Sequence, residues 1–180
     1  GFPDGISGVE LLERLRLQAG RYGAKVQTGV VESIERDGDA FVASVGDERI
    51  HARKVLLATG IVDKEPEMRD IREAIRCGCI RLCPICDGFE VADTTVAVYG
   101  PAKNATKHAL FIRTFVREAT VLVPRGDEPL TREECEELHR CGVHVVDAPV
   151  AQIYMTGDRR AGVRTADGAE HVFDTVYPSL

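Results

Sequence analysis

Residues 95–100 read TVAVYG, a run of β-branched and apolar residues that ends in glycine. Such a run is typical of a strand that is buried on both faces of a parallel sheet. Residues 102–117 follow with apolar side chains at helical intervals, and residues 119–123 form a second β-rich run. This strand–helix–strand order predicts a parallel sheet joined by right-handed crossover connections.

The same alternation continues toward the C-terminus. Thr131 and Glu134 have the spacing of a capping box and predict a second helix that ends near Gly142. Residues 143–146 then predict a third strand. Short strands separated by glycine-containing turns are predicted after it, at residues 150–155, 161–165 and 170–176. The fold class is therefore α/β.

The N-terminal third of the chain has a different pattern. Ser7 and Glu10 form another capping-box pair, and the apolar spacing after them predicts a helix that Gly23 ends. Residues 54–58, which read KVLLA, predict a buried strand, and the polar residues 61–76 are interpreted as a linker. Short strands are predicted between the helix and the buried strand, at residues 25–28, 30–36 and 40–45.

The composition is that of a folded protein with an acidic balance of charge. The chain has 180 residues, of which 44% are hydrophobic and 29% charged, and its formal net charge is −6. Nucleic-acid binding needs basic residues that neutralise phosphates, so this balance argues against it. No apolar run approaches the roughly 20 residues of a membrane helix, and no secretory leader opens the sequence. We therefore expect no membrane association and a reducing, cytoplasmic compartment.

The start of the sequence is also informative. The two methionines are Met68 and Met155, so Gly1 is not a translation start. We therefore expect the sequence to be a piece of a longer protein. An incomplete domain would leave apolar surface uncovered, so we also expect self-association or a loss of order near the termini.

The clearest chemical motif is a C-x-x-C pair, Cys83 and Cys86, followed directly by Asp87. Two cysteines at this spacing can form a disulfide when the residues between them make a tight turn or the first turn of a helix, which Pro84 favours. A helix N-terminus also favours the thiolate, the reactive form in thiol–disulfide exchange. The adjacent carboxylate could transfer the proton that this exchange requires. The motif therefore predicts a redox-active pair.

Two other interpretations of the cysteines stay open on the residues alone, namely inert buried thiols and a zinc site. A zinc site would take its four thiolates from within ten residues: Cys77, Cys79, Cys83 and Cys86. Structural zinc sites usually separate two cysteine pairs by a longer loop, so this crowding argues against zinc. Cys135 and Cys141 fall in and at the end of the second predicted helix and are interpreted as ordinary thiols. No metal ligand is assigned.

The loop after the first strand is the second chemical feature, and it reads GPAKNA at residues 100–105. Between a strand and a helix, this is the position of the G-x-G-x-x-G/A fingerprint, in which a helix N-terminus binds a dinucleotide pyrophosphate. Gly100 and Ala105 match the fingerprint. Ala102 replaces its middle glycine, and Pro101 removes one amide donor. The location therefore favours a nucleotide site, and the loop residues weaken it.

Taken in order, these features resemble the low-molecular-weight thioredoxin reductase family of FAD-dependent pyridine nucleotide-disulfide oxidoreductases. Residues 1–8 with the first helix resemble the segment after the family's flavin-binding start, and residues 58–60 resemble its A-T-G flavin-contact turn. Residues 83–89, CPICDGF, resemble its C-A-T-C-D-G-F redox centre. Residues 95–105 lie where the family places its NADPH fingerprint.

The resemblance implies a Rossmann-like three-layer nucleotide-binding domain with a parallel sheet and a β-meander, plus an incomplete part of an FAD-binding domain. Residues 1–63 would belong to the FAD-binding domain, and residues 64–172 to the NAD(P)-binding-like domain with the redox centre. Residues 173–180 would be the return link. The flavin motif would lie upstream of residue 1, and the links near 61–67 and 174–178 would be hinges.

The resemblance also implies a reaction in which a nicotinamide reduces FAD, FAD reduces the cysteine pair, and the dithiol reduces a disulfide of a thioredoxin-like protein. In that cycle Cys86 faces the flavin, Cys83 attacks the substrate disulfide, and Asp87 is the acid/base. The intact enzyme would be a homodimer, whereas this chain alone would bind no FAD and be inactive. The implied cofactor contacts are Val31, Ala58, Thr59 and Gly60 for FAD, and Gly100, Ala102, Asn104, Ala105 and Arg125 for the nucleotide.

Two departures from the family pattern bear on the electron donor. The fingerprint reads GPAKNA instead of G-G-G-x-x-A, and the H-R-R stretch that holds the 2′-phosphate of NADPH reads PRG at residues 124–126. With one of the two arginines present, a bidentate phosphate clamp is not expected. The alternative is therefore a reductase of the same fold that uses ferredoxin or another donor. A zinc-bound structural module is the alternative from a different class.

Overall fold

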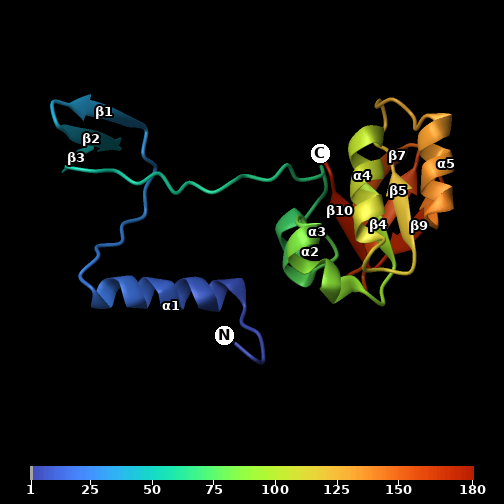
Figure 1. Cartoon of the computed structure of the whole chain (residues 1–180), viewed down its shortest axis with the longest axis horizontal. Coiled ribbons are helices and arrows are strands. Elements are labelled where there is room, and N and C mark those ends of the chain that lie inside the picture. The colour runs from blue at the N-terminus through green and yellow to red at the C-terminus, as the bar shows by residue number, and fades with distance from the viewer. Residues whose placement is uncertain (1) are drawn as a thin grey trace. The chain divides into compact units, whose positions relative to one another are not determined.

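The chain forms two compact units, residues 1–60 and residues 61–180. The computed structural model describes residues 2–180. The second unit contains a four-stranded parallel sheet in the order β10-β4-β5-β6 (Figure 1). Its strands are β4 (Val96–Tyr99), β5 (Ala119–Leu122), β6 (Val143–Val145) and β10 (Thr175–Pro178). The predicted α/β fold with a parallel sheet is confirmed.

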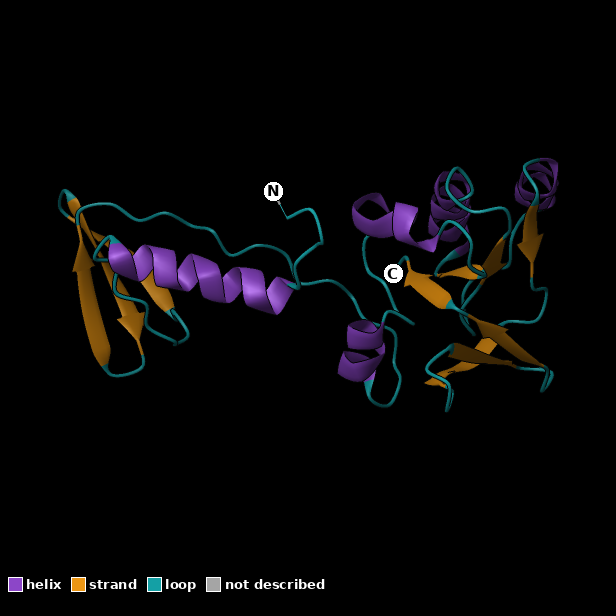
Figure 2. Cartoon of the chain, turned by 90° about the horizontal axis from the view of Figure 1, so that it is seen from below, coloured by secondary structure: helices purple, strands orange, loops and turns teal. Residues whose placement is uncertain are grey.

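Two other layers cover the parallel sheet. α4 (Ala102–Ile112) and α5 (Arg132–Arg140) pack on one face, and an antiparallel sheet packs on the other (Figure 2). Successive residues of β4 serve the two cores, since Val98 packs with the helices and Ala97 packs with the antiparallel strands. The antiparallel strands are β7 (Val150–Met155), β8 (Ala161–Thr165) and β9 (Glu170–Phe173).

The C-terminal segment differs from its prediction. One strand was expected over residues 170–176 and a return link over 173–180. The structure instead ends β9 at Phe173, and after Asp174 residues 175–178 form β10, which joins the parallel sheet beside β4. The Asp174 carboxylate accepts hydrogen bonds from the N–H and the hydroxyl of Thr95, both at 2.7 Å, and these bonds hold the residue between the two strands in place. The single strand predicted over residues 170–176 is therefore wrong, because two strands in different sheets occupy this segment.

The predicted linker also contains structure. α2 (Ile71–Cys77) lies within residues 61–76, where no helix was expected. Ala74 is fully buried, and Ile71 and Ile75 pack against the same core, so three apolar positions anchor this short helix. Charged residues surround these three apolar positions, so the segment was interpreted from the sequence as a polar linker and not as a helix.

The lengths of the two long helices of this unit follow local signals. α5 has the predicted capping box in full, because Thr131 and Glu134 each bond to the backbone of the other. α4 is shorter than predicted and ends at Ile112 rather than near residue 117. The turn after it is held by Arg113, which donates to the Val116 carbonyl at 2.8 Å.

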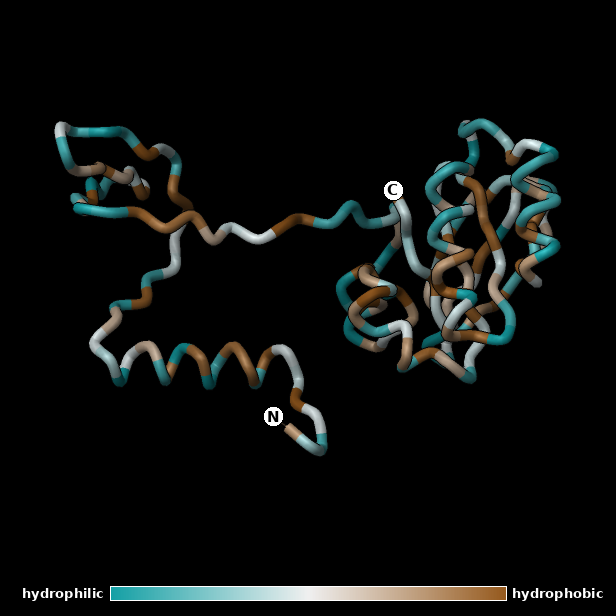
Figure 3. The backbone as a smooth tube through the Cα atoms, in the orientation of Figure 1, coloured by the Kyte–Doolittle hydropathy of each residue, from teal (hydrophilic) through white to brown (hydrophobic). Residues whose placement is uncertain are grey.

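The first unit is the smaller of the two and begins with a helix. α1 (Gly8–Arg21) begins where predicted, because the Ser7 hydroxyl accepts a hydrogen bond from the Glu10 N–H at 3.2 Å. None of its residues is buried, and Figure 3 shows apolar positions recurring along the helix. The strands that follow it form an antiparallel sheet: β1 (Ser33–Asp37), β2 (Ala40–Val45) and β3 (Glu48–Ala52).

Two strands predicted for the first unit are wrong. Residues 25–28 and residues 54–58 form neither helix nor strand. Leu56 is 89% exposed and Leu57 is 72% exposed, although the run was predicted to be buried. A buried parallel strand needs hydrogen-bonding neighbours, and within the described residues none pairs with 54–58. In the same range, 2–180, no helix combines the length and the apolar character needed to cross a membrane.

Candidate redox site

Cys83 and Cys86 form a disulfide at the start of a short helix. α3 (Pro84–Asp87) has Cys83 at its N-cap position and Pro84 in its first turn. The Cys86 N–H donates to the Cys83 carbonyl at 2.9 Å, and this turn brings the two Cα atoms to 5.3 Å. That separation lies within the range for disulfides. The helical first turn therefore places the two sulfurs together in the way that the motif predicted.

The disulfide lies at the surface of the second unit. Cys86 is exposed and Cys83 is half-buried. The two apolar side chains nearest to the pair in sequence face solvent, since Ile85 is 81% exposed and Phe89 is 83% exposed. A large exposed apolar side chain is informative where it flanks a reactive group, because such positions are typical of contact with a partner. The pair is thus open to another molecule.

Asp87 is held by two side chains from other parts of the second unit. Arg81 Nη1 donates to Asp87 Oδ2 at 2.9 Å and to Glu90 Oε2 at 2.8 Å. The Tyr177 hydroxyl donates to Asp87 Oδ1 at 2.7 Å. Tyr177 is fully buried, and burial raises the pKa of its phenol, with a further contribution from the hydrogen bond to Asp87. Both carboxylate oxygens therefore have a donor.

An open cavity of about 410 Å³ lies beside the disulfide and the Asp87 carboxylate. Cys83, Asp87 and Arg81 line it together with Cys77. One disulfide cysteine, one acidic residue and one arginine thus border a single solvent-accessible space. This arrangement can exchange a disulfide with an entering thiol and transfer the accompanying proton.

The other cysteines are placed as ordinary thiols. Cys79 is almost completely buried, and burial is the main cause that raises the pKa of its thiol to about 12, with a smaller effect from Cys77. Cys79 is therefore a neutral, unreactive thiol near pH 7. The Cys77 sulfur lies 3.4 Å from the Ala74 carbonyl oxygen and 3.7 Å from the Met155 sulfur.

The zinc alternative finds no support in this geometry. Cys83 and Cys86 are bonded to each other and so are not free thiolates. In the part of the chain that the structure describes, no three His, Cys, Asp or Glu side chains are grouped to hold a metal ion. Cys135 is half-buried on α5, and Cys141 is exposed at its end.

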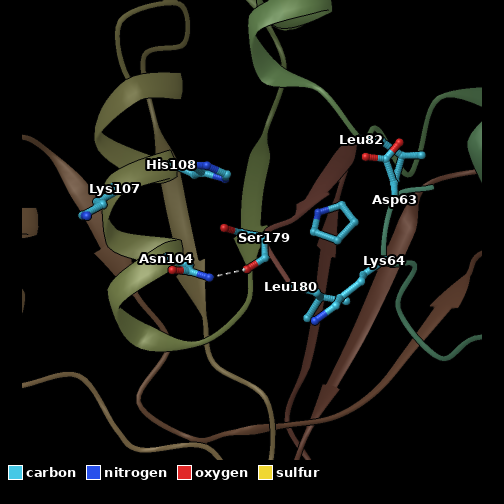
Figure 4. Close-up of a pocket in the computed structure, with 9 residues that line it drawn as sticks. Asp63, Lys64, Leu82, Asn104, Lys107, His108, Ser179 and Leu180 are labelled. Carbon is cyan, nitrogen blue, oxygen red and sulfur yellow. Dashed lines mark hydrogen bonds between the residues drawn. The ribbon is translucent and has the colours of Figure 1, made fainter. Parts of the chain in front are cut away.

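The predicted nucleotide residues lie around two cavities rather than one. Asn104 lines a cavity of about 320 Å³ beside α4, and its amide points toward the Ser179 carbonyl, to which it donates at 3.4 Å (Figure 4). Arg125 is exposed and lines a second cavity of about 550 Å³. Gly100 and Ala105 are buried, and Ala102 begins α4.

The surroundings of Arg125 suit a phosphate poorly. Glu65 and Glu67 line the same cavity as Arg125, so two carboxylates share this space with the one arginine and would repel a phosphate there. A Cβ on Gly100 would lie 2.5 Å from the Ser179 carbonyl oxygen. The close passage of residue 179 therefore requires this glycine whether or not a nucleotide binds.

The predicted flavin residues form no cradle in the described part of the first unit. Val31 lies on one segment without helix or strand, and residues 58–60 lie on another. All four residues are exposed, so by themselves they do not enclose a ring system.

Two residues of the site were missed by the sequence reasoning. Arg81 lies two residues before Cys83, so its charge beside the motif was a usable signal. Tyr177 lies 90 residues after Asp87 and reaches it only because β10 joins the parallel sheet beside β4. No local pattern in the sequence reveals that contact.

No protein-family profile matches the chain. Over 128 residues, which are 71% of this chain, it is 34% identical to the thioredoxin reductase of Mycolicibacterium smegmatis. Over 129 residues it is 36% identical to the bifunctional thioredoxin reductase/thioredoxin of Mycobacterium leprae. The chain spans 40% of the first protein and 28% of the second, so it corresponds to less than half of either.

Solved structures match the fold over nearly the whole chain. The crystal structure of HlmI matches 99% of this chain with a TM-score of 0.83 and 30% identity, and the match covers 57% of that chain. Thioredoxin reductase from Streptococcus pyogenes matches 100% of this chain with a TM-score of 0.82 and 22% identity, over 61% of its own chain, and so supports the fold. The chain therefore belongs to the thioredoxin reductase-like pyridine nucleotide-disulfide oxidoreductases and corresponds to part of their length.

Proposed function

We propose that the chain is the disulfide-exchanging part of a flavin-dependent oxidoreductase that reduces a protein disulfide. The observation that carries this proposal is the solvent-open Cys83–Cys86 disulfide with the Asp87 carboxylate beside it in the sequence and in one cavity with Cys83. Neither a buried structural bridge nor a zinc site would need an exposed sulfur with an adjacent acid/base group. The family is FAD-dependent, and in the whole protein FAD would supply the two electrons that reduce the pair.

The exchange balances in two steps. The Cys83 thiolate attacks one sulfur of the substrate disulfide, so a mixed disulfide forms and the other substrate sulfur leaves as a thiolate. The Cys86 sulfur then attacks Cys83, the Cys83–Cys86 disulfide forms, and the second substrate sulfur leaves. Asp87 accepts the proton of the Cys86 thiol and returns it to the leaving sulfur. The substrate gains two electrons and the pair loses two.

We propose a thioredoxin-like protein as the substrate. Ile85 and Phe89 project beside the disulfide, and an apolar patch of this kind suits the apolar surface around the disulfide of a small redox protein. The relative from Mycobacterium leprae is named as a reductase joined to thioredoxin, which supports the same substrate class. In this proposal the whole protein acts as a homodimer in the cytoplasm.

The electron donor is proposed to be a carrier other than NADPH. The carboxylates of Glu65 and Glu67 share the cavity of Arg125, and Pro101 lacks the amide that a fingerprint loop would offer. These observations favour the second candidate from the sequence, a reductase of the same fold that receives electrons from ferredoxin or a similar protein. Bleaching of the flavin of the whole protein by NADPH would contradict this choice of donor.

A mixed-disulfide trap tests the proposed function. Reduced Cys86→Ser chain is mixed with oxidised thioredoxin, and we expect a covalent one-to-one complex through Cys83, because the residue that resolves the intermediate is missing. Intact-mass spectrometry, followed by peptide mapping, identifies the bond. Cys83→Ser is the matched control and should trap less than a tenth as much. Equal trapping by both variants, or by neither, would contradict the assigned roles.

A further inference from the structure

Tyr177 connects the far end of the chain to the redox pair. Its side chain is fully buried on β10, yet its hydroxyl reaches the Asp87 carboxylate at 2.7 Å. Arg81 holds the other carboxylate oxygen at 2.9 Å. The carboxylate therefore cannot rotate about its Cβ–Cγ bond without breaking at least one of these contacts, and its position relative to the neighbouring Cys86 is set from outside α3.

We propose that Tyr177 is a positioning residue for thiol–disulfide exchange at Cys83–Cys86 and that it acts through Asp87. The inference rests on the proposed function and adds a residue that the family resemblance did not indicate. It also makes β10 part of the redox site, because the hydroxyl that orients the carboxylate comes from this strand of the parallel sheet.

The hydroxyl, rather than the ring, is the part of Tyr177 that acts on Asp87. A phenylalanine would fill the same apolar core with no polar group to satisfy, whereas a buried hydroxyl must find a partner. The Tyr177 hydroxyl uses its donor on Asp87. Burial also raises the pKa of this phenol, so Tyr177 stays a neutral donor at every pH at which thiols exchange.

The charged neighbours of the carboxylate come from a small number of elements. Arg81, on the segment before α3, pairs with Asp87 and with Glu90 of the 3-10 helix Gly88–Val91, which follows α3. Glu90 is itself largely exposed, so solvent screens its charge. Tyr177 approaches from β10 and contributes no charge. Tyr177→Phe therefore removes one of the two groups that orient the carboxylate and leaves the net charge around it unchanged.

A small dithiol provides a probe that needs no flavin. When dithiothreitol reduces the pair, one of its thiols attacks Cys83, the Cys83–Cys86 bond breaks, and Cys86 leaves. The proton of the attacking thiol passes to Asp87 and then to the Cys86 sulfur. The second dithiothreitol thiol attacks the dithiothreitol sulfur bonded to Cys83, the ring disulfide of dithiothreitol forms, and the proton of that thiol goes to the released Cys83 sulfur. Dithiothreitol becomes oxidised and the pair becomes reduced. A displaced Asp87 should slow this reaction most at low pH, where the attacking thiol still carries its proton.

The test is a double-mutant cycle on the 180-residue chain. The rate of reduction by dithiothreitol is measured from pH 6 to pH 9, by acid quenching, alkylation and mass spectrometry. We expect Tyr177→Phe to be about tenfold slower at pH 6 and less than about twofold slower at pH 9. Tyr154→Phe is the matched control, because it also removes a tyrosine hydroxyl from a carboxylate, that of Glu170, at an exposed position. It should change the rate by less than about twofold.

The second arm of the cycle separates positioning from general damage. In an Asp87→Asn background, Tyr177→Phe should change the rate by less than about twofold, since the group it positions no longer transfers protons. Arg81→Lys, which alters the contact to the other oxygen, should show the same loss of effect in that background. Circular dichroism melting curves check that each variant is folded.

The outcomes distinguish the inference from the proposed function. A Tyr177→Phe rate equal to that of Tyr154→Phe, or an equal slowing with and without Asp87, would overturn the role of Tyr177 and leave Asp87 untouched. A rate for Asp87→Asn equal to that of the unaltered chain would contradict the acid/base role in the proposed function, and the inference with it.

Discussion

Replacing Cys83 with serine is expected to abolish electron transfer from the reduced chain to oxidised thioredoxin, with a loss of at least about a thousandfold in rate. A serine oxygen forms no bond to sulfur under these conditions, so no mixed disulfide can form at position 83. A mixed disulfide formed at Cys86 would have no second cysteine to resolve it. The measurement is a single turnover. The chain is reduced, freed of reductant and mixed with oxidised thioredoxin, and the new thioredoxin thiols are counted after acid quenching.

The matched control for this experiment is Cys141→Ser. Cys141 is a free, exposed cysteine at the end of α5, so the substitution is chemically the same but lies outside the redox site. Its rate should stay within about twofold of the unaltered chain. If the Cys83→Ser chain still reduces thioredoxin at a rate near that of the control, another thiol is the nucleophile and the assignment of Cys83 is wrong.

Truncation of Ile112 to alanine should cost the second unit about 3 kcal/mol of unfolding free energy. Ile112 is fully buried at the end of α4, and its Cδ1 atom would lie 3.3 Å from a Cβ on Gly88, directly after the redox helix. The lost methyl groups leave a cavity under this segment, so the substitution also loosens the support of α3. Urea unfolding followed by tyrosine fluorescence measures the change.

Ile85→Ala provides the comparison for that substitution. It removes the same atoms from a side chain that is 81% exposed, and the free energy of unfolding should change by less than about 0.5 kcal/mol. In the thioredoxin assay we expect the opposite order, with a larger loss of rate for Ile85→Ala than for Ile112→Ala. Ile85 flanks the disulfide, so its truncation should weaken the binding of the partner. A large stability loss for Ile85→Ala would show that the residue is part of a core and not of a docking surface.

Local signals in the sequence predicted the second unit well. The TVAVYG run, the capping box at Thr131 and the turn-forming Pro84 each act within a few residues, and each element formed where its signal lay. The C-x-x-C pair belongs to the same class, because a single helical turn is enough to bring its sulfurs together. These features depend on backbone geometry and helix capping, which are determined by residues close together in the sequence.

The errors arise where distant residues decide the structure. Residues 175–178 read as the end of a meander strand or a link, yet they pair with β4, which lies about 80 residues earlier in the chain. Residues 54–58 have the composition of a buried strand but find no neighbour among the described residues. The contact between Tyr177 and Asp87 has the same origin, because a hydrogen bond across 90 residues follows from sheet order and leaves no trace in local pattern.

The midpoint potential of the Cys83–Cys86 pair tests the central claim most directly, namely that this disulfide exchanges electrons rather than serving as a structural bridge. The 180-residue chain is equilibrated in dithiothreitol buffers of graded potential at pH 7, and the reduced fraction is counted by alkylation and mass spectrometry. We predict a two-electron midpoint between about −180 and −280 mV, the range of exchange-active pairs. A pair that stays oxidised to potentials below about −300 mV, as structural disulfides do, would contradict the account.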